Sequence, residues 1–193
     1  MCCRYRILPR RDDAVVAAIL AGLDKKYPGL YKIGEIFPGD AAPAVIEHAG
    51  KLVPVPATFG FPGFDGKKTV LNARSETAEQ KPTFAQSLRQ RRIVLPADGF
   101  FEWSKEPEKT KYLFTADAGK TVYLCGCYKN VDGVLRFVIL TRPANGSVQP
   151  VHDRMPVIAF EEEVRPFLTD TAAALNIVAR ASPFLARARA EET

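Results

Sequence analysis

The stretch TVYLCGCYKNVDGVLRFVIL, residues 121–140, carries the pattern that decides the fold. Two runs rich in Val, Leu, Ile, Tyr and Phe stand on either side of the pair Asp132-Gly133. Such runs are typical of β-strands, and Asp-Gly is one of the dipeptides that close a two-residue hairpin turn. The stretch therefore predicts two antiparallel strands joined by a tight turn.

The four cysteines of the chain occur as two tight pairs. Cys125 and Cys127 lie two positions apart in the first predicted strand, so they share one face, where we interpret them as buried core thiols. Cys2 and Cys3 form the other pair. Neither spacing is typical of a secreted disulfide framework or of a zinc knuckle, and 193 residues can bury a core without disulfides.

Further strands and a few helices are predicted around this hairpin. Short runs rich in β-branched and aromatic residues predict strands at 44–48, 51–56, 93–103 (two strands with a turn), 111–116 and 175–179, and one that runs into a polar loop over 69–77. Helices are predicted at about 12–26 from the capping residues Asp12 and Asp13, at 82–92 from Pro82 in the first turn, and at 161–168 from three acidic residues at the start.

These elements predict one domain, because the sequence has no internal repeat and no obvious linker. We expect a β-rich α+β domain over residues 2–180, with mostly antiparallel strands curled into a barrel-like sheet and flanking helices. Residues 181–193 end in RARAEET, and we expect them to form a flexible tail.

The apolar run AVVAAILAGL, residues 14–23, follows Arg10 and Arg11 and so imitates an export signal. Asp12 and Asp13 interrupt the basic region and are placed to cap a helix, and the run lacks a small-x-small cleavage site. It is also too short to span a bilayer. We therefore expect a helix of a cytoplasmic protein.

The net charge of the chain is +5, and its pI is about 9.1. A positive surplus of this size suits a polyanionic partner such as nucleic acid, but it also suits an enzyme with an ordinary basic surface. Composition alone leaves both alternatives open.

Four polar residues lie where their apolar neighbours predict burial. Asn72 and Arg74 alternate with apolar residues at the end of a strand and should point to one face, although Asn72 could instead cap a turn. Glu102 is flanked by aromatic residues, a setting that raises a carboxyl pKa and suits acid/base work, but it could also pair with an arginine on a solvated face. His152 precedes an Asp-Arg pair and could equally be an ordinary loop histidine.

The first residues, MCCRYR, place a cysteine directly after the initiator methionine. Removal of Met1 would expose the α-amine and the thiol of Cys2 on adjacent carbons, a 1,2-aminothiol. No internal cysteine offers this pair. An α-amino group has an ordinary pKa of about 7.7–8.0, so a useful fraction is neutral near physiological pH.

Five motifs, MCCRYR, NARSET, PADGFFEW, YLCGCYKN and LTRPANGSVQPVHDRMPVI, occur in this order between residue 2 and about residue 158. Together they resemble the motifs of the SRAP (SOS response-associated peptidase) family. The resemblance implies an abasic-site sensor that acts on single-stranded DNA in the DNA damage response and forms a thiazolidine crosslink to the ring-opened sugar. It also implies peptidase-like removal of residues that precede the cysteine, and a lyase activity.

The same motifs imply roles for individual residues. Cys2 would be the nucleophile, and Glu102 would shuttle protons while the sugar opens and the Schiff base forms. Asn72 would position the N-terminus or the lesion. His152 would act on the sugar hydroxyl or assist reversal of the crosslink. The resemblance implies no cofactor and no metal.

Four residues are candidates for DNA binding. The motif match implies a phosphate contact for Arg74, and adjacency to the site suggests the same for Arg4 and Arg154. Phe59 precedes a glycine where the family tends to show Trp-Gly, and we choose it as a base-stacking residue. The phenylalanines of TFGFPGF either line such a groove or pack in the core. We expect a monomer that acts in the cytoplasm, at the nucleoid if the source is prokaryotic.

Two other functions are compatible with these residues. Cys2 could be the nucleophile of an amidohydrolase, with its own α-amine as the base. Alternatively, the arginines and phenylalanines could bind single-stranded DNA without any reaction. Cys2→Ala would leave all DNA association intact only in this last case.

Overall fold

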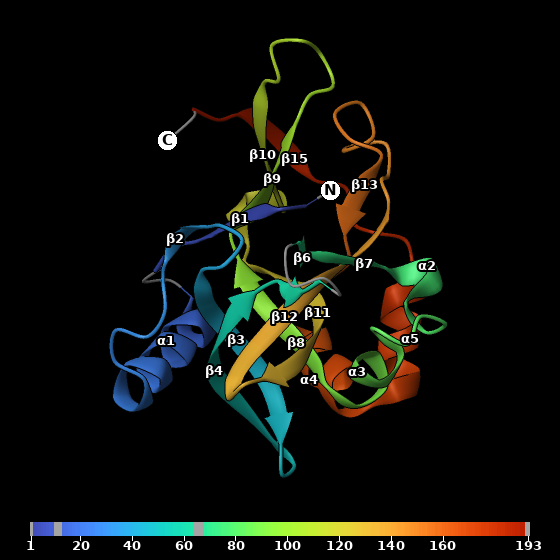
Figure 1. Ribbon diagram of the computed structural model, residues 1–193. Coiled ribbons are helices and arrows are strands. Elements are labelled where there is room, and N and C mark those ends of the chain that lie inside the picture. The colour runs from blue at the N-terminus through green and yellow to red at the C-terminus, as the bar shows by residue number, and fades with distance from the viewer. Residues whose placement is uncertain (1, 10–12, 64–67, 192–193) are drawn as a thin grey trace.

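Five strands of the larger sheet pair in a closed ring, which makes a small β-barrel at the centre of the molecule (Figure 1). The computed structural model describes residues 2–9, 13–63 and 68–191. Neighbours in the ring pair antiparallel, except β4 and β12, which are parallel. The strands of the ring are β3 (Ala41–His48), β4 (Lys51–Phe59), β12 (Val134–Pro143), β11 (Val122–Val131) and β8 (Arg92–Ala97).

The hairpin predicted from residues 121–140 forms two sides of this barrel. β11 and β12 pair from Gly126↔Ile139 to Val131↔Val134. The two turn residues have positive φ, 52° at Asp132 and 81° at Gly133, as a tight hairpin turn of this class requires. The predicted α+β class and the curled, mostly antiparallel sheet are confirmed.

A second sheet has β1 as an internal strand, with β9 on one side and β2 on the other. β10 follows β9, and β15 forms the far edge. The first residues of the described chain therefore lie inside a sheet. The bounds are β1 Arg4–Ile7, β2 Gly34–Ile36, β9 Gly99–Trp103, β10 Lys111–Thr115 and β15 Ala186–Arg189.

Short strands extend the barrel next to the candidate residues. β7 (Asn72–Arg74) pairs parallel with β12, and β13 (Arg154–Pro156) pairs antiparallel with the same end of β12. Thr141 is the register partner of both Arg74 and Pro156, so the NARSET and HDRMPV segments flank one strand. The remaining short strands are β5 (Phe61–Pro62), β6 (Thr69–Val70) and β14 (Ile158–Ala159).

Alternate residues of the barrel strands divide between two apolar clusters. One cluster joins residues from all five barrel strands to the smaller sheet, including Cys2, Tyr5, Phe100 and Phe114. The other cluster includes the intervening barrel residues and the apolar faces of the helices. The smaller sheet therefore covers the barrel interior, whereas the helices pack outside the barrel. The helices are α1 (Ala14–Lys26), α2 (Ser75–Ala78), α3 (Ala85–Gln90), α4 (Glu161–Thr169) and α5 (Thr171–Ala179), with a short 3₁₀ turn at Asp117–Gly119.

Local signals in the sequence account for the predicted helices. The Asp13 carboxylate accepts the Val16 N–H at 2.9 Å and caps α1, whereas Asp12 lies outside the described residues.

Cys125 and Cys127 are fully buried on the side of the barrel that the helices cover, as predicted. Among the described residues, no helix has the length and apolar character needed to cross a membrane.

Two predictions near the C-terminus are wrong. Residues 175–179, predicted as a strand, belong to α5, because the Asp170 carboxylate accepts the N–H groups of Ala172 and Ala173 and starts a helix there. Part of the expected flexible tail is also ordered. Ala186–Arg189 forms β15, which pairs antiparallel with β10.

Candidate functional site

Cys2 lies directly before β1 and is fully buried. Its thiol donates to the backbone carbonyl of Arg4, with Sγ 3.9 Å from the oxygen. Burial raises the thiol pKa well above its ordinary value, and the negative charge of Glu102 raises it further. The thiol is therefore held in its protonated form near neutral pH.

The side chain of Asn72, on the short strand β7 that pairs with β12 of the barrel, contacts Cys2. Its side-chain Nδ2 donates to the Cys2 carbonyl oxygen at 3.0 Å. The parallel pairing of β7 with β12 places Asn72 there, opposite Ile139. The structure thus brings Asn72 and Cys2 together, as the motifs implied, although 70 positions separate them.

Glu102 lies on β9, the strand that pairs with β1. The register Arg4↔Phe101 places Glu102 beside the segment that precedes β1. The side chain is only 2% exposed, and desolvation raises its carboxyl pKa to about 7. This agrees with the expectation from its aromatic neighbours. A carboxyl group with this pKa exists in both protonation states at neutral pH, which suits proton transfer.

Two acidic residues hold β1 in place. The Asp98 carboxylate accepts the Leu8 N–H at 2.7 Å and lies 3.8 Å from the Arg6 guanidinium. At the other end of the strand, the Arg4 guanidinium donates to Glu35 at 3.1 Å. The segment that carries Cys2 is therefore fixed by side chains as well as by strand pairing.

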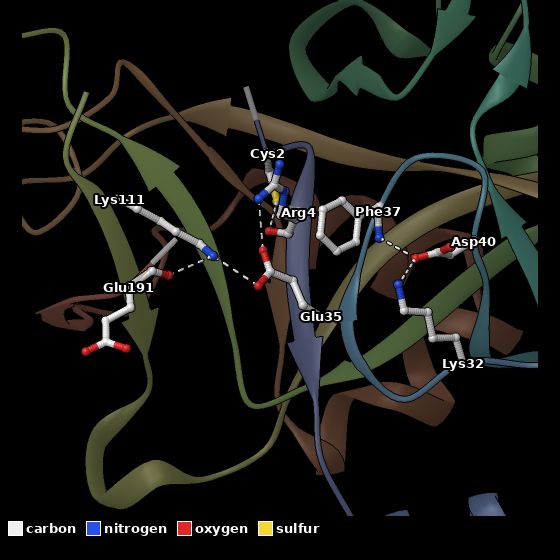
Figure 2. Close-up of polar contacts among 8 residues, drawn as sticks. All are labelled: Cys2, Arg4, Lys32, Glu35, Phe37, Asp40, Lys111 and Glu191. Carbon is white, nitrogen blue, oxygen red and sulfur yellow. Dashed lines mark hydrogen bonds and ion pairs between the residues drawn. The ribbon is translucent and has the colours of Figure 1, made fainter. Parts of the chain in front are cut away.

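The Glu35 carboxylate binds two cations, as Figure 2 shows. One oxygen accepts from Arg4, and the other lies 3.0 Å from the Lys111 ammonium, whose side chain is only 1% exposed. Lys111 also donates to the backbone carbonyl of Glu191 at 3.2 Å. This network was not predicted from the sequence, because its members come from four distant segments and no motif joins them.

Aromatic rings surround the same two cations. The Arg4 guanidinium lies 4.3 Å from the centroid of the Phe37 ring and 4.8 Å from that of Trp103. The Lys111 ammonium lies 4.4 Å from the centroid of Phe101. Such contacts stabilise partly desolvated cations, so these side chains support β1 from the face opposite Glu102.

His152 lies just before β13, at the end of the turn that follows β12. Its Nδ1 accepts the Arg154 backbone N–H at 3.0 Å, which fixes the orientation of the ring. Burial lowers the imidazole pKa. The ring is therefore mostly neutral at physiological pH and can exchange a proton.

Two of the three arginines expected to contact phosphate are engaged within the protein. Arg4 is held by Glu35 and two rings, and Arg154 donates to both Glu76 carboxylate oxygens at 2.5 and 2.8 Å. Arg154 lowers the pKa of Glu76 to about 2. In this structure both arginines stabilise the site through these ion pairs. Their contact with phosphate stays a prediction. Arg74 is exposed and stays a candidate.

Phe59 is fully buried, so its assignment as a base-stacking residue is wrong for this structure. Its ring stacks on that of Phe137, with centroids 4.9 Å apart and planes 2° from parallel. Phe61 is also buried, whereas Phe64 lies outside the described residues. Of the two alternatives for this segment, core packing holds for Phe59 and Phe61.

No group of three or more His, Cys, Asp or Glu side chains that could hold a metal ion occurs in the part of the chain that the structure describes. The site consists of Cys2, the Asn72 amide that binds its carbonyl and the buried carboxyl group of Glu102, whose pKa is raised. This set can direct a nucleophile and transfer protons.

Comparison with known proteins gives a family match over nearly the whole chain. The sequence model of the SRAP family, SOS response associated peptidase, matches residues 1–190. The abasic site processing protein YedK of Escherichia coli is 27% identical over 181 residues, which cover 87% of this chain and 79% of YedK. The abasic site processing protein YobE of Bacillus subtilis is 32% identical over 106 residues, about half of each chain.

Solved structures share the fold. A protein from Bacteroides thetaiotaomicron has a TM-score of 0.78 at 19% identity, with 98% of this chain and 92% of that chain covered. A phage-related protein from Bordetella bronchiseptica has a TM-score of 0.75 at 22% identity, with 99% and 95% covered. At these identities, the likeness concerns the fold alone.

Proposed function

The chain belongs to the SRAP family of SOS response associated peptidases, and from this premise we propose that it processes abasic sites in single-stranded DNA by crosslinking itself to them through Cys2. Relatives named abasic site processing proteins support the substrate. The observation that carries the proposal is the hydrogen bond from Asn72 to the Cys2 carbonyl, next to the buried carboxyl group of Glu102.

The reaction begins at the α-amine of Cys2 and requires that Met1, which lies outside the described residues, be removed. The neutral amine attacks the C1′ aldehyde of the ring-opened abasic sugar and forms a carbinolamine. Glu102 in its acid form donates a proton to the C1′ hydroxyl, which leaves as water and gives a protonated Schiff base. The Glu102 carboxylate is then available as a base.

The second bond forms at the same carbon. The Cys2 thiol adds to C1′, its proton passes to Glu102, and the former imine nitrogen keeps the electron pair of the broken π-bond. The product is a five-membered thiazolidine ring, and one water has been lost overall. Burial favours this order of steps, because it keeps the thiol protonated and leaves the amine as the first nucleophile.

Other residues take supporting roles in this proposal. Asn72 fixes the Cys2 carbonyl so that the amine approaches the aldehyde in one orientation. His152 exchanges a proton with the sugar hydroxyl or assists reversal, and exposed Arg74 contacts a phosphate. Where further residues precede Cys2, peptidase-like removal of them would expose the same amine. We place this activity in the cytoplasm, where a monomer meets damaged DNA.

Denaturing gel electrophoresis tests the crosslink. Met1-trimmed protein is incubated with a single-stranded oligonucleotide that carries one abasic site, and in parallel with the intact oligonucleotide. We expect a heat-stable shifted band with the abasic DNA alone. Its intact mass should equal the sum of protein and DNA minus one water.

Variants of the two adjacent cysteines separate the chemical steps. Cys2→Ala should give no heat-stable band. Cys2→Ser, like Cys2→Ala, keeps the α-amine and should give a Schiff base that survives denaturation only after borohydride reduction. Cys3→Ala is the matched control and should crosslink like the unmodified chain.

Other results would contradict the proposal. If trimmed protein forms no band, self-crosslinking is wrong. Hydrolysis of a small amide without DNA would then point to an amidohydrolase, and equal DNA binding by Cys2→Ala with no covalent product would point to a non-catalytic DNA-binding protein.

A further inference from the structure

The C-terminal strand β15 carries two arginines into the sheet that holds Glu102. Figure 1 shows β15 beside β10, at the same end of the molecule as β1 and β13. Arg187 pairs in register with Phe114, and Arg189 with Tyr112. Residues directly opposite each other on antiparallel strands point to the same face of the sheet. The side chains of β15 can therefore be placed relative to those of β9.

One cross-strand row leads from Glu102 to the sheet edge. Tyr112 is the register partner of both Glu102 and Arg189, so these three side chains lie on one face. The adjacent row on the same face contains Phe114 and Arg187. Tyr112 is half-buried, whereas both arginines are exposed. The face that is closed at Glu102 therefore opens to solvent towards β15.

Arg187 and Arg189 differ from the arginines near Cys2 in their ion pairing. Arg4 and Arg154 are in ion pairs with Glu35 and Glu76. Neither Arg187 nor Arg189 forms an ion pair with a described carboxylate. The Arg187 guanidinium instead lies 5.0 Å from the centroid of the Tyr112 ring. This arrangement leaves two positive charges and a flat, cationic surface available to a ligand.

The segment before β15 is fixed to the turn that leads to His152. The Asn145 amide donates to the Pro183 carbonyl at 2.8 Å, and the Leu185 N–H donates to the Ser147 hydroxyl at 3.2 Å. Leu185 itself is buried in the same core cluster as Cys2. The position of β15 is therefore defined by packing at one end and by strand pairing along its length.

We propose that Tyr112, Arg187 and Arg189 form a docking surface for the DNA strand that flanks the lesion. The inference rests on the proposed function and extends it to a specific part of the substrate. Arg189 and Arg187 bind phosphates, and a neighbouring base stacks on the Arg187 guanidinium above Tyr112. Single-stranded DNA fits this surface because it supplies both negative charges and exposed base faces.

The first test measures reversible binding in a Cys2→Ala background, which has no thiol at residue 2 and cannot close the stable thiazolidine ring. Affinity for a fluorescent single strand with one abasic site is measured over a range of salt concentrations. In the double variant R187Q/R189Q, the slope of log affinity against log salt should fall by about 0.7 for each lost phosphate contact. The matched control R89Q/R165Q removes two exposed arginines from α3 and α4 and should keep the slope.

The second test addresses stacking. Tyr112→Ala should weaken binding roughly tenfold, whereas Tyr112→Phe keeps the ring and should bind like the parent. Thermal unfolding of each variant checks that β15 stays paired with β10. If Tyr112→Ala lowers the melting temperature, stacking is tested instead with the double variant R187K/R189K. That variant should keep the salt slope but weaken stacking, because an ammonium is not planar.

The outcomes separate this inference from the proposed function. If the unmodified chain forms no covalent band, the proposed function fails whatever the arginine variants do. If it crosslinks, and R187Q/R189Q binds with the parent's affinity and salt slope, the docking surface alone is wrong. A double variant that changes only the self-association of the protein, measured by analytical ultracentrifugation, would also overturn it and indicate that β15 contacts a second copy.

Discussion

The side-chain amide of Asn72 donates a hydrogen bond of 3.0 Å to the backbone carbonyl of Cys2. This contact joins a short strand of the barrel to the segment before β1, and it fixes the residue on which the proposed chemistry depends. An amide is well suited to this task, because it donates to a carbonyl without adding a charge to a buried site.

Replacing Asn72 should slow the crosslink without abolishing it. We expect Asn72→Ala to lower the single-turnover rate roughly tenfold at saturating DNA, since one hydrogen bond contributes about 1 kcal/mol or slightly more. The rate is measured from the growth of the shifted band. Asn176→Ala, at an exposed position of α5, is the matched control. An unchanged rate in Asn72→Ala would show that the contact has no part in the reaction.

Glu102 should govern the pH dependence of the crosslinking rate. Its pKa of about 7 means that the acid form, which protonates the departing hydroxyl, is lost as the pH rises past neutrality. The neutral fraction of the amine rises over the same range, so the rate should pass through a maximum. Glu102→Gln should be slower by roughly 10²–10⁴-fold and lack the descending limb. A descending limb that persists in Glu102→Gln would assign it to another group.

The same carboxyl group should make the protein less stable as the pH rises. Its folded-state pKa lies above the ordinary value of 4.5, so the unfolded chain loses the proton first. The destabilisation is absent below about pH 4.5 and complete above pH 7, where it reaches roughly 3 kcal/mol. Urea unfolding at several pH values should therefore show Glu102→Gln gaining stability relative to the parent between pH 5 and pH 8. Parallel pH profiles for the two proteins would contradict this.

Replacing Glu35 should lower the free energy of unfolding more than replacing Lys111. Glu35→Gln leaves Arg4 and the buried Lys111 without a carboxylate, so we expect a loss of about 3–5 kcal/mol in the free energy of unfolding. Lys111→Met fills a similar volume and leaves Glu35 paired with Arg4, so its cost should be clearly smaller. Chemical denaturation measures both. If Lys111→Met costs as much as Glu35→Gln, the carboxylate does not serve both cations.

Much of the barrel was predictable because its signals are local. The alternation of residues 121–140 and their Asp-Gly turn are properties of a single hairpin, and they appear in the structure as β11 and β12. The error at residues 175–179 has a local cause as well. Leu, Ile and Val favour a strand there, but Asp170 caps a helix and Ala174 and Ile177 are buried at helical spacing.

The site was predictable where motifs carry it and not where partners are distant. Asn72, Glu102 and Cys2 were identified from their segments, and the structure brings them together. The engagement of Arg4 by Glu35, 31 positions away, and of Arg154 by Glu76, 78 positions away, depends on tertiary packing that no local pattern reveals. The burial of Phe59 could have been inferred from its alternation with Val55 and Ala57 along β4.

Because β1 is hydrogen-bonded on both sides, the molecule has a particular response to mechanical force. A motor that pulls on DNA bonded to Cys2 would load β1 along its own axis, against β2 and β9 together. Hydrogen bonds in this shear geometry break as a group, whereas those of an edge strand can open one after another. A forced-unfolding rate depends on the barrier to that first rupture. The sheet should therefore resist a pull applied at Cys2 more strongly than a pull applied to an edge strand such as β15.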